Sequence, residues 1–453
     1  MKDLTQGSIV GHLIRMASVM LVGMMGQTLY YLVDLYFVAR IGPEAIAGVG
    51  AAGNITFVVL ALTQILNVGT IALVSHAAGR KDQRDANLVF NQSLALSALV
   101  GVFVLVAGYL LTPLYLHMLS ADGEMQRAGI TYLYWFLPGL ALQFAMVSMS
   151  AALRGTGIVQ PTMTVQVLTV LLNALLAPVL IAGWITGRPL GVAGAGLAST
   201  ISIAAGVLML TLYFTKLEKY VGFHSEQWHP RPAYWKRILN IGLPAGGEFF
   251  VMFLMMGLMY WLIRPFGAEA QAGYGVGQRI MQAIFLPAMA VAFSVAPVAG
   301  QNFGARRTER VREAFRKAVL LETAIMVVIT LLAQMAPSVF IRPFTTDAKV
   351  IEVGTLFLRI ISWNFVGTGI IFTCSGMFQA MGNTWPALLS GASRLVIFGA
   401  PALWLSMQPS FHLELVWEMS VVTVIIQAVL SYTLLQLEMR KKLASAAPAA
   451  VAT

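Results

Sequence analysis

The residues of this chain that could do chemistry are the few charged side chains that lie within long apolar runs. The first is Asp34, in the run from Met16 to Ala39. A carboxylate inside an apolar helix is costly, so ion or proton binding is the first hypothesis for it. The alternative is that Asp34 lies near the helix end and pairs with Arg40. Tyr30 and Tyr31 precede it by four and three residues and make its face amphipathic, which favours the functional interpretation.

Four more charges lie inside apolar runs. Glu248 follows Pro244 by four residues, where a bent helix could open a wet pocket around a carboxylate. Glu322 is expected near the cytoplasmic end of its run, with its carboxylate reaching water. Arg279 and Arg394 could act as gates or counter-charges, but arginines packed against backbone carbonyls would give the same pattern.

Neutral polar residues also occur in the apolar runs, and most such groups bond neighbouring helices. Asn173 and Ser199 are among them, and a structural role is the default for each. Some of these neutral polar residues could nevertheless line a substrate cavity. The candidates for a substrate cavity around Glu248 are Tyr30, Tyr31, Gln27, Gln64 and Asn67. The 24 methionines would suit a cavity that accepts varied apolar shapes.

Composition excludes most other functions. Of 453 residues 58% are hydrophobic and 11% charged, against about a quarter charged in soluble domains, so the chain is an integral membrane protein. The single Cys374 and six scattered histidines predict no metal site and no disulfide. A phosphate loop and a clustered acid, base or metal constellation are both missing, which argues against ATP drive and against an enzyme. No cofactor is expected.

Length and periodicity predict an all-α chain with about twelve transmembrane helices. The predicted spans are 12–39, 47–78, 88–118, 128–153, 159–183, 191–215, 238–263, 271–300, 314–340, 352–378, 386–407 and 415–437. Most of the 29 Lys and Arg fall on one side of this pattern. The positive-inside rule then predicts a multi-pass inner-membrane protein with both termini cytoplasmic. The same asymmetry accounts for the net charge of +10 without nucleic acid as a partner.

An internal repeat divides the chain into two halves. A shift of 225 positions aligns Gly42-Pro43-Glu44-Ala45 with Gly267-Ala268-Glu269-Ala270, and Gly79, Gly157 and Pro161 with Gly304, Gly382 and Pro386. The predicted domains are a six-helix bundle over 1–218, a cytoplasmic linker over 219–235, a second bundle over 236–440 and a disordered tail over 441–453. Because six is even, the repeats are parallel, and a substrate path between them is expected.

These residues resemble the multidrug and toxic compound extrusion (MATE) family, in its NorM-like branch. The likeness rests on YLVDLYFVARIGPEAIAGVG in the first span, the GRKDQRDA and GARRTERV loops, ALRGTGIVQPTM and NALLAPVLI. It implies antiport, in which H+ or Na+ entry drives export of organic, often cationic, compounds by alternating access. It also implies that Asp34 is the carboxylate of the cation site, that Asn173 lies beside this site and that Glu248 is the helix-seven acid. Ser199 is a further candidate for the coupling-ion site.

The chain departs from the family pattern at two acids. Ala177 stands where some members have a carboxylate, and the run from Gly367 to Met377 holds none. With fewer carboxylates a caged Na+ site is less well supplied than a proton site, so H+ is expected in preference to Na+. The expected partners are organic cations or amphiphiles and the lipid bilayer, and the expected state is a monomer. A lipid-linked oligosaccharide flippase is the rival; it would need a more cationic cavity or extra helices.

Overall fold

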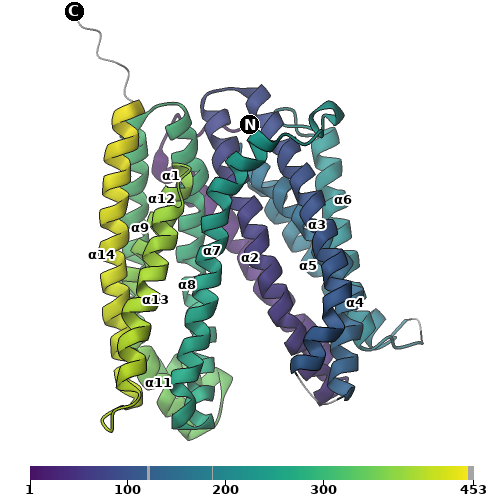
Figure 1. The fold of residues 1–453 in the computed structure, drawn as a ribbon, viewed down its shortest axis with the longest axis vertical. Coiled ribbons are helices and arrows are strands. Elements are labelled where there is room, and N and C mark those ends of the chain that lie inside the picture. Colours follow the sequence, from purple (N-terminus) through teal and green to yellow (C-terminus); the bar gives the residue numbers. More distant parts are fainter. Residues whose placement is uncertain (120–122, 186, 447–453) are drawn as a thin grey trace, which may run out of the picture. The chain divides into compact units, whose positions relative to one another are not determined.

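The computed structural model describes residues 1–119, 123–185 and 187–446, without the side chains of residues 30–32, 34, 35, 44, 445 and 446. This part of the chain contains fourteen α-helices, four short 3-10 helices and no strand (Figure 1). The α-helices are α1 (Ile9–Ala39), α2 (Pro43–Gly79), α3 (Gln83–Leu119), α4 (Gly123–Gly155), α5 (Gln160–Ile181), α6 (Val192–Lys216), α7 (Pro232–Ile263), α8 (Ala268–Gly304), α9 (Thr308–Met335), α10 (Pro337–Ile341), α11 (Ala348–Ile361), α12 (Phe365–Ala380), α13 (Trp385–Leu405) and α14 (Leu413–Ala446). The 3-10 helices are η1 (Ser225–Gln227), η2 (Arg264–Phe266), η3 (Arg342–Phe344) and η4 (Ser362–Asn364).

Twelve helical segments among the described residues are long and apolar enough to cross a membrane. The predicted fold class, all-α with twelve spans, is therefore confirmed. One span, Ala348–Ala380, consists of α11, η4 and α12 in sequence. Three boundaries differ from prediction by six residues or more: α7 begins at Pro232 rather than 238, α9 begins at Thr308 rather than 314, and α14 continues to Ala446 rather than 437. The first part of the predicted tail is thus helical, while residues 447–453 lie outside the described part.

The internal repeat appears in the backbone conformation of the turns. Lys81 and Arg306, which are 225 positions apart, are the two described non-glycine residues with positive φ, at 60° and 56°. Gly157 and Gly382 form a second matched pair, with φ of 81° and 68°. A positive φ is costly for residues with a Cβ, so its recurrence at matched positions is specific. The same turns therefore end the second and fourth helices of each half.

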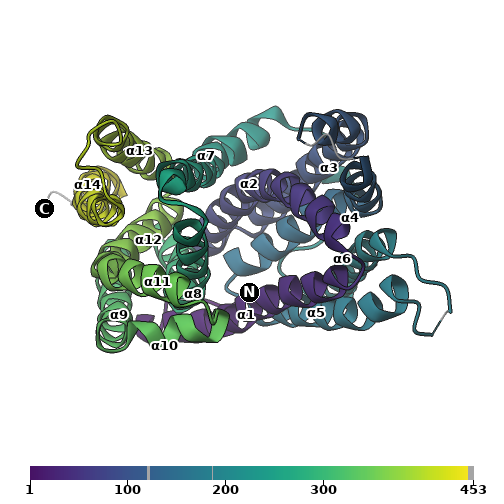
Figure 2. The ribbon, with the colours of Figure 1, turned by 90° about the horizontal axis from the view of Figure 1, so that it is seen from below.

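The chain forms two compact units. The first comprises Met1–Asp3 and Val19–Gly246, and the second comprises Leu4–Ser18 and Gly247–Thr453. In the first unit α4 packs against α2, α3 and α6, and α5 packs against α6. In the second, α8 and α12 pack against each other, and α9 packs against both (Figure 2). The start of α7 thus belongs to the first unit, whereas the sequence places the second bundle's start at 236.

Glycines explain why the start of α7 packs with the first unit. A Cβ atom at Gly69 of α2 or at Gly242 of α7 would collide with the carbonyl oxygen of Ile238 or Ile65, respectively. Small residues let membrane helices approach until their backbones touch. Ile238 is fully buried in the core of this unit. The unit boundary consequently falls at Gly246, two residues before the functional candidate Glu248.

Amide side chains of α3 hold the connection between α6 and α7. Asn87 Oδ1 accepts from the Gly222 N–H at 2.8 Å, and Asn91 Oδ1 accepts from the His224 N–H at 3.0 Å. Gln92 Oε1 accepts from the Arg231 N–H at 2.9 Å. These bonds satisfy backbone groups that no helix pairs. The predicted linker is therefore an ordered segment fixed to the first unit.

Candidate functional site

The first candidate, Asp34, lies in α1, but its side chain and those of Tyr30 and Tyr31 are outside the described part of the structure. The side chains of α1 two turns before Asp34 are described. The Gln166 amide of α5 donates to Gln27 Oε1 at 2.5 Å, so α1 and α5 touch at this level. Gly23, one turn before, allows that approach, because a Cβ there would collide with Met163. The predicted cavity residue Gln27 is therefore bonded across α1 and α5.

Asn173 is the buried amide of α5, with a side chain that is 1% exposed. Neither Oδ1 nor Nδ2 has a hydrogen-bond partner among the described residues. Buried amides are almost always paired, and an unpaired one costs about 1–3 kcal/mol. Asn173 follows Gln166 by seven residues, which puts both on one helix face. Ser199 is buried on α6, the helix that packs against α5.

Gln64 and Asn67 of α2 form a polar chain with Arg154, in the last turn of α4. Asn67 donates to Gln64 Oε1 at 2.8 Å, and Arg154 Nη2 donates to Asn67 Oδ1 at 2.7 Å. Arg154 Nε also donates to the Ser150 carbonyl at 3.3 Å. Sequence analysis names both amides as cavity candidates. In this structure their polar atoms bond one another and a guanidinium.

Glu248 of α7 bonds across to α12 in the second unit. Ser375 Oγ donates to Glu248 Oε2 at 3.0 Å, and Gln379 Nε2 lies 3.4 Å from the same hydroxyl oxygen. The side chain of Glu248 is half-buried, with Gly247 beside it against Leu388 of α13. No basic side chain bonds this carboxylate in the described structure. It can therefore accept a further donor or a cation.

Glu322 of α9 is a second carboxylate in the same unit. Its side chain is 1% exposed, and Thr373 Oγ1 of α12 donates to its Oε2 at 3.0 Å. Its other oxygen, Oε1, has no hydrogen-bond partner among the described residues. Gly369 makes room for it, since a Cβ at Gly369 would lie 2.8 Å from Glu322 Cγ. The predicted exposure of this carboxylate to water is wrong.

The two arginines within spans differ in environment. Arg279 of α8 is exposed on its helix. Arg394 of α13 is partly buried, and its Nη2 donates to Ser420 Oγ of α14 at 3.2 Å. Its Nε is buried without a partner among the described residues. Arg394 thus links α13 to α14, which fits the packing alternative left open by the sequence.

Comparison with known proteins identifies the family. The MatE family model matches the chain over residues 20–179 and again over 244–405. The two matches begin 224 positions apart. The chain belongs to the MatE family. The double match agrees with the 225-residue repeat, so each half of this MATE chain carries the family pattern.

Named relatives and solved structures agree with this MATE assignment. A Thermotoga maritima protein named as a probable multidrug resistance protein NorM is 26% identical over 80% of this chain and 78% of its own length. The multidrug export protein MepA of Staphylococcus haemolyticus is 25% identical over 83% of each chain. An outward-facing multidrug resistance MATE transporter has a TM-score of 0.90 at 25% identity, covering 97% of this chain and 98% of that one. A MOP superfamily transporter from Pyrococcus furiosus shares the fold at 24% identity and a TM-score of 0.90.

The sequence of this MATE chain indicates Glu322 as a charge within a span but not its burial. The predicted span starts at 314, which puts Glu322 eight residues from the cytoplasmic end. The residues that α9 adds before 314 are largely charged, so the earlier start does not explain the burial. Glu322 is buried because Gly369 and Thr373 of α12 pack against it. Among the described residues no group of three His, Cys, Asp or Glu could hold a metal ion.

Proposed function

We propose that this MATE protein is a secondary active transporter of the inner membrane that exports organic, often cationic, compounds in exchange for an inward cation. Membership of the MatE family and the naming of relatives for multidrug export support this function. The twelve candidate spans provide the membrane body that such transport needs. The two compact units are the proposed moving bodies in alternating access. The protein works as a monomer with both termini in the cytoplasm.

The observation that carries a coupling-ion site is the unpaired amide of Asn173. Asp34 lies seven residues after Gln27 on α1, and Asn173 lies seven residues after Gln166 on α5. Each is therefore about 10 Å along its helix from the Gln27–Gln166 hydrogen bond. First and fifth spans cross the membrane in the same direction, so this register brings Asp34 and Asn173 to one level. The proposed site comprises Asp34 and Asn173, with Ser199 from the neighbouring helix. A proton needs one base, whereas Na+ needs several oxygens, so H+ is the proposed coupling ion.

Glu248 is the proposed substrate contact of the second unit. Glu248 accepts a single hydroxyl and has no bonded cation among the described residues, so it can serve as a counter-charge for a cationic compound. Tyr30, Tyr31, Gln27, Gln64 and Asn67 are the remaining proposed cavity residues. Glu322 is more deeply buried and has one unpaired oxygen, so we assign it to ion coupling rather than to substrate.

The test is export of an organic-cation dye from cells or proteoliposomes, with and without an imposed proton or sodium gradient. Dye export that follows the proton gradient supports the proposal, and export without any gradient contradicts it. Glu248→Gln should then weaken export of cationic compounds more than that of neutral or zwitterionic ones. The control is Glu352→Gln, which changes an exposed carboxylate on α11 by the same chemistry. Equal losses for every compound class in Glu248→Gln would assign Glu248 to the coupling site instead.

A further inference from the structure

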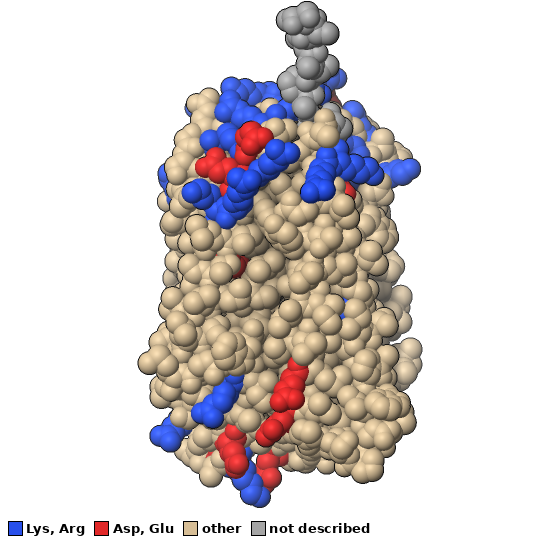
Figure 3. Space-filling view, turned by 90° about the vertical axis from the view of Figure 1, so that its left-hand side faces the viewer, with Lys and Arg blue, Asp and Glu red and all other residues tan. Residues whose placement is uncertain are grey.

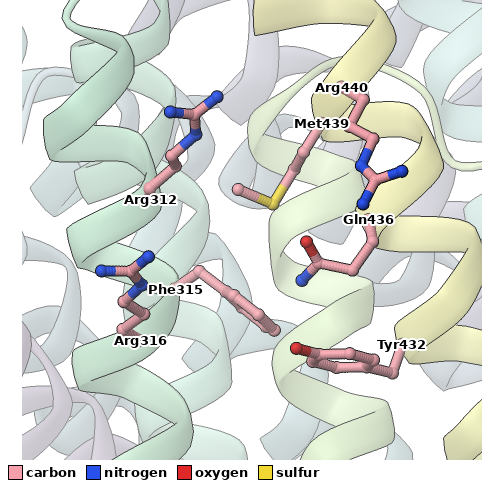
Figure 4. A pocket seen from close by; sticks show the side chains of 7 residues that line it. All are labelled: Arg312, Phe315, Arg316, Tyr432, Gln436, Met439 and Arg440. Carbon is pink, nitrogen blue, oxygen red and sulfur yellow. The ribbon is translucent and has the colours of Figure 1, made fainter.

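A charged cavity lies in the second unit, away from the carboxylates described above. It has a volume of about 290 Å³ and lies between α9 and α14. Both helices pack against α12, which leaves the cavity between them. The residues that line it are Arg312, Phe315 and Arg316 of α9 and Tyr432, Gln436, Met439 and Arg440 of α14 (Figure 4).

The cavity carries excess positive charge. Arg312 forms an ion pair with Glu309 at 2.9 Å, whereas Arg316 and Arg440 have no ion-pair partner in the described part of the chain. Glu438, the acid nearest to Arg440 along α14, is already bonded to Lys442 at 3.3 Å. Two guanidinium groups are therefore available to an external anion. Guanidinium groups match the oxygens of a phosphate with paired hydrogen bonds.

The cavity also has apolar and aromatic lining residues. Phe315 and Met439 are each 5% exposed, and the rings of Phe315 and Tyr432 lie 6.0 Å apart. On α14, Tyr432 and Arg440 are eight residues apart on one face, a separation of about 12 Å along the helix. Beyond the rings, Leu320 and Val429 are 65% and 63% exposed on the same two helices. On α14 a basic group thus leads into an aromatic ring and then into an apolar helix surface, and on α9 Arg316 directly follows Phe315.

This gradient follows the order of groups in a phospholipid. On the face of the second unit drawn in Figure 3, Lys and Arg gather at one end, next to a broad band with few charged atoms. The same end of this unit holds the N-terminal segment, since Arg307 donates to the Thr5 carbonyl at 2.7 Å. Basic pockets between helices at the cytoplasmic surface are suited to anionic lipid headgroups.

We propose that the cavity between α9 and α14 binds the headgroup of one anionic phospholipid. Arg316 and Arg440 contact the phosphate, Gln436 donates to a headgroup oxygen, and Phe315 and Tyr432 pack beside the glycerol and upper acyl carbons. A zwitterionic choline lipid binds less well, because its quaternary ammonium adds a positive charge beside two guanidinium groups. A soluble phosphate lacks the acyl chains that cover the exposed apolar surface of the two helices.

The test uses the purified full-length protein and native mass spectrometry with dioleoylphosphatidylglycerol or dioleoylphosphatidylcholine in the micelle. Arg316→Gln/Arg440→Gln should weaken phosphatidylglycerol binding about 30-fold, which corresponds to about 1 kcal/mol for each basic residue. The matched control is Lys317→Gln/Lys441→Gln, which removes the same charge from adjacent exposed residues that do not line the cavity. It should keep wild-type binding. Thermal unfolding of both variants checks that they fold.

Three results would overturn the proposal. An equal loss of phosphatidylglycerol binding in the lysine control would show general attraction of the lipid to a basic surface. Phosphatidylcholine binding as strong as phosphatidylglycerol binding would show that charge does not select the ligand. Displacement of the lipid by inorganic phosphate alone would show a soluble-anion site. The readout is lipid binding rather than transport, so a failed export assay leaves this test unaffected.

Discussion

Replacing Asn173 by leucine should make the protein more stable and less active. The amide is 1% exposed, and neither of its polar atoms has a partner among the described residues. Each unpaired buried polar group costs about 1–3 kcal/mol. Leucine has the same number of side-chain heavy atoms and the same branching, so little volume is lost. Removing two unpaired atoms should raise the free energy of unfolding by about 1–2 kcal/mol after some strain from the added hydrogens.

The function should change in the opposite direction. Asn173 is proposed to bind the coupling ion together with Asp34, and leucine has no oxygen to offer it. Loss of one ligand worth about 1.4 kcal/mol weakens ion binding about tenfold. Gradient-driven export of an organic cation from proteoliposomes should fall by a similar factor at limiting proton gradient. A merely structural amide would give a stability change without this loss.

Asn67→Leu is the matched control, because Asn67 is also a buried amide but is bonded to Gln64 and Arg154. Its loss leaves Arg154 Nη2 without its acceptor and should destabilise the protein by about 1.5–3 kcal/mol. The two substitutions should therefore shift the thermal unfolding temperature in opposite directions. If Asn173→Leu were as destabilised as Asn67→Leu and still exported the dye at the wild-type rate, the coupling-site reasoning would be refuted.

Three further predictions concern ion coupling and orientation. Asp34→Asn should abolish export of every substrate without loss of membrane insertion, because an amide cannot ionise; wild-type dye efflux in this variant would exclude Asp34 from coupling. Glu322→Gln should keep the Thr373 bond and normal thermal stability but lose gradient-driven dye export, and unchanged export would leave Glu322 a structural role only. The orientation is tested with single cysteines in a Cys374→Ser background. A cysteine in place of the exposed Gly187 should react with an impermeant thiol reagent in intact cells, and one in place of the exposed Ser225 should not. The reverse labelling would show that the orientation is inverted.

The membrane spans were predictable because a helix that crosses a bilayer needs about 20 apolar residues in one run. The repeat was predictable as well, since turns that require positive φ keep glycines at fixed positions. Gly157 and Gly382 illustrate this, because their φ values agree within a few tens of degrees at a separation of 225. The pattern at Lys81 and Arg306 was not predictable, since residues with a Cβ rarely adopt that conformation.

The features that sequence reasoning did not reach depend on tertiary packing. The start of α7 joins the first unit because Gly69 and Gly242 let α2 and α7 approach closely, and a single sequence does not show which glycines face each other. The linker is fixed by amides of α3 that lie more than 130 residues away, as in the Asn87 bond to Gly222. Glu322 looked peripheral because a single sequence does not show that Gly369 and Thr373 of α12 pack against it.

The uncharged helix α12 explains how two separate carboxylates can act in one unit. Thr373 donates to Glu322 on α9, and Ser375 donates to Glu248 on α7. Residues two apart in a helix point about 200° away from each other, so the two hydroxyls serve opposite sides of α12. A hydroxyl can donate to a carboxylate or accept from a carboxylic acid, so each bond survives a change in proton occupancy with its direction reversed. Rotation or sliding of α12 would change both contacts together, and would thereby link the carboxylate proposed for ion coupling to the one proposed for substrate.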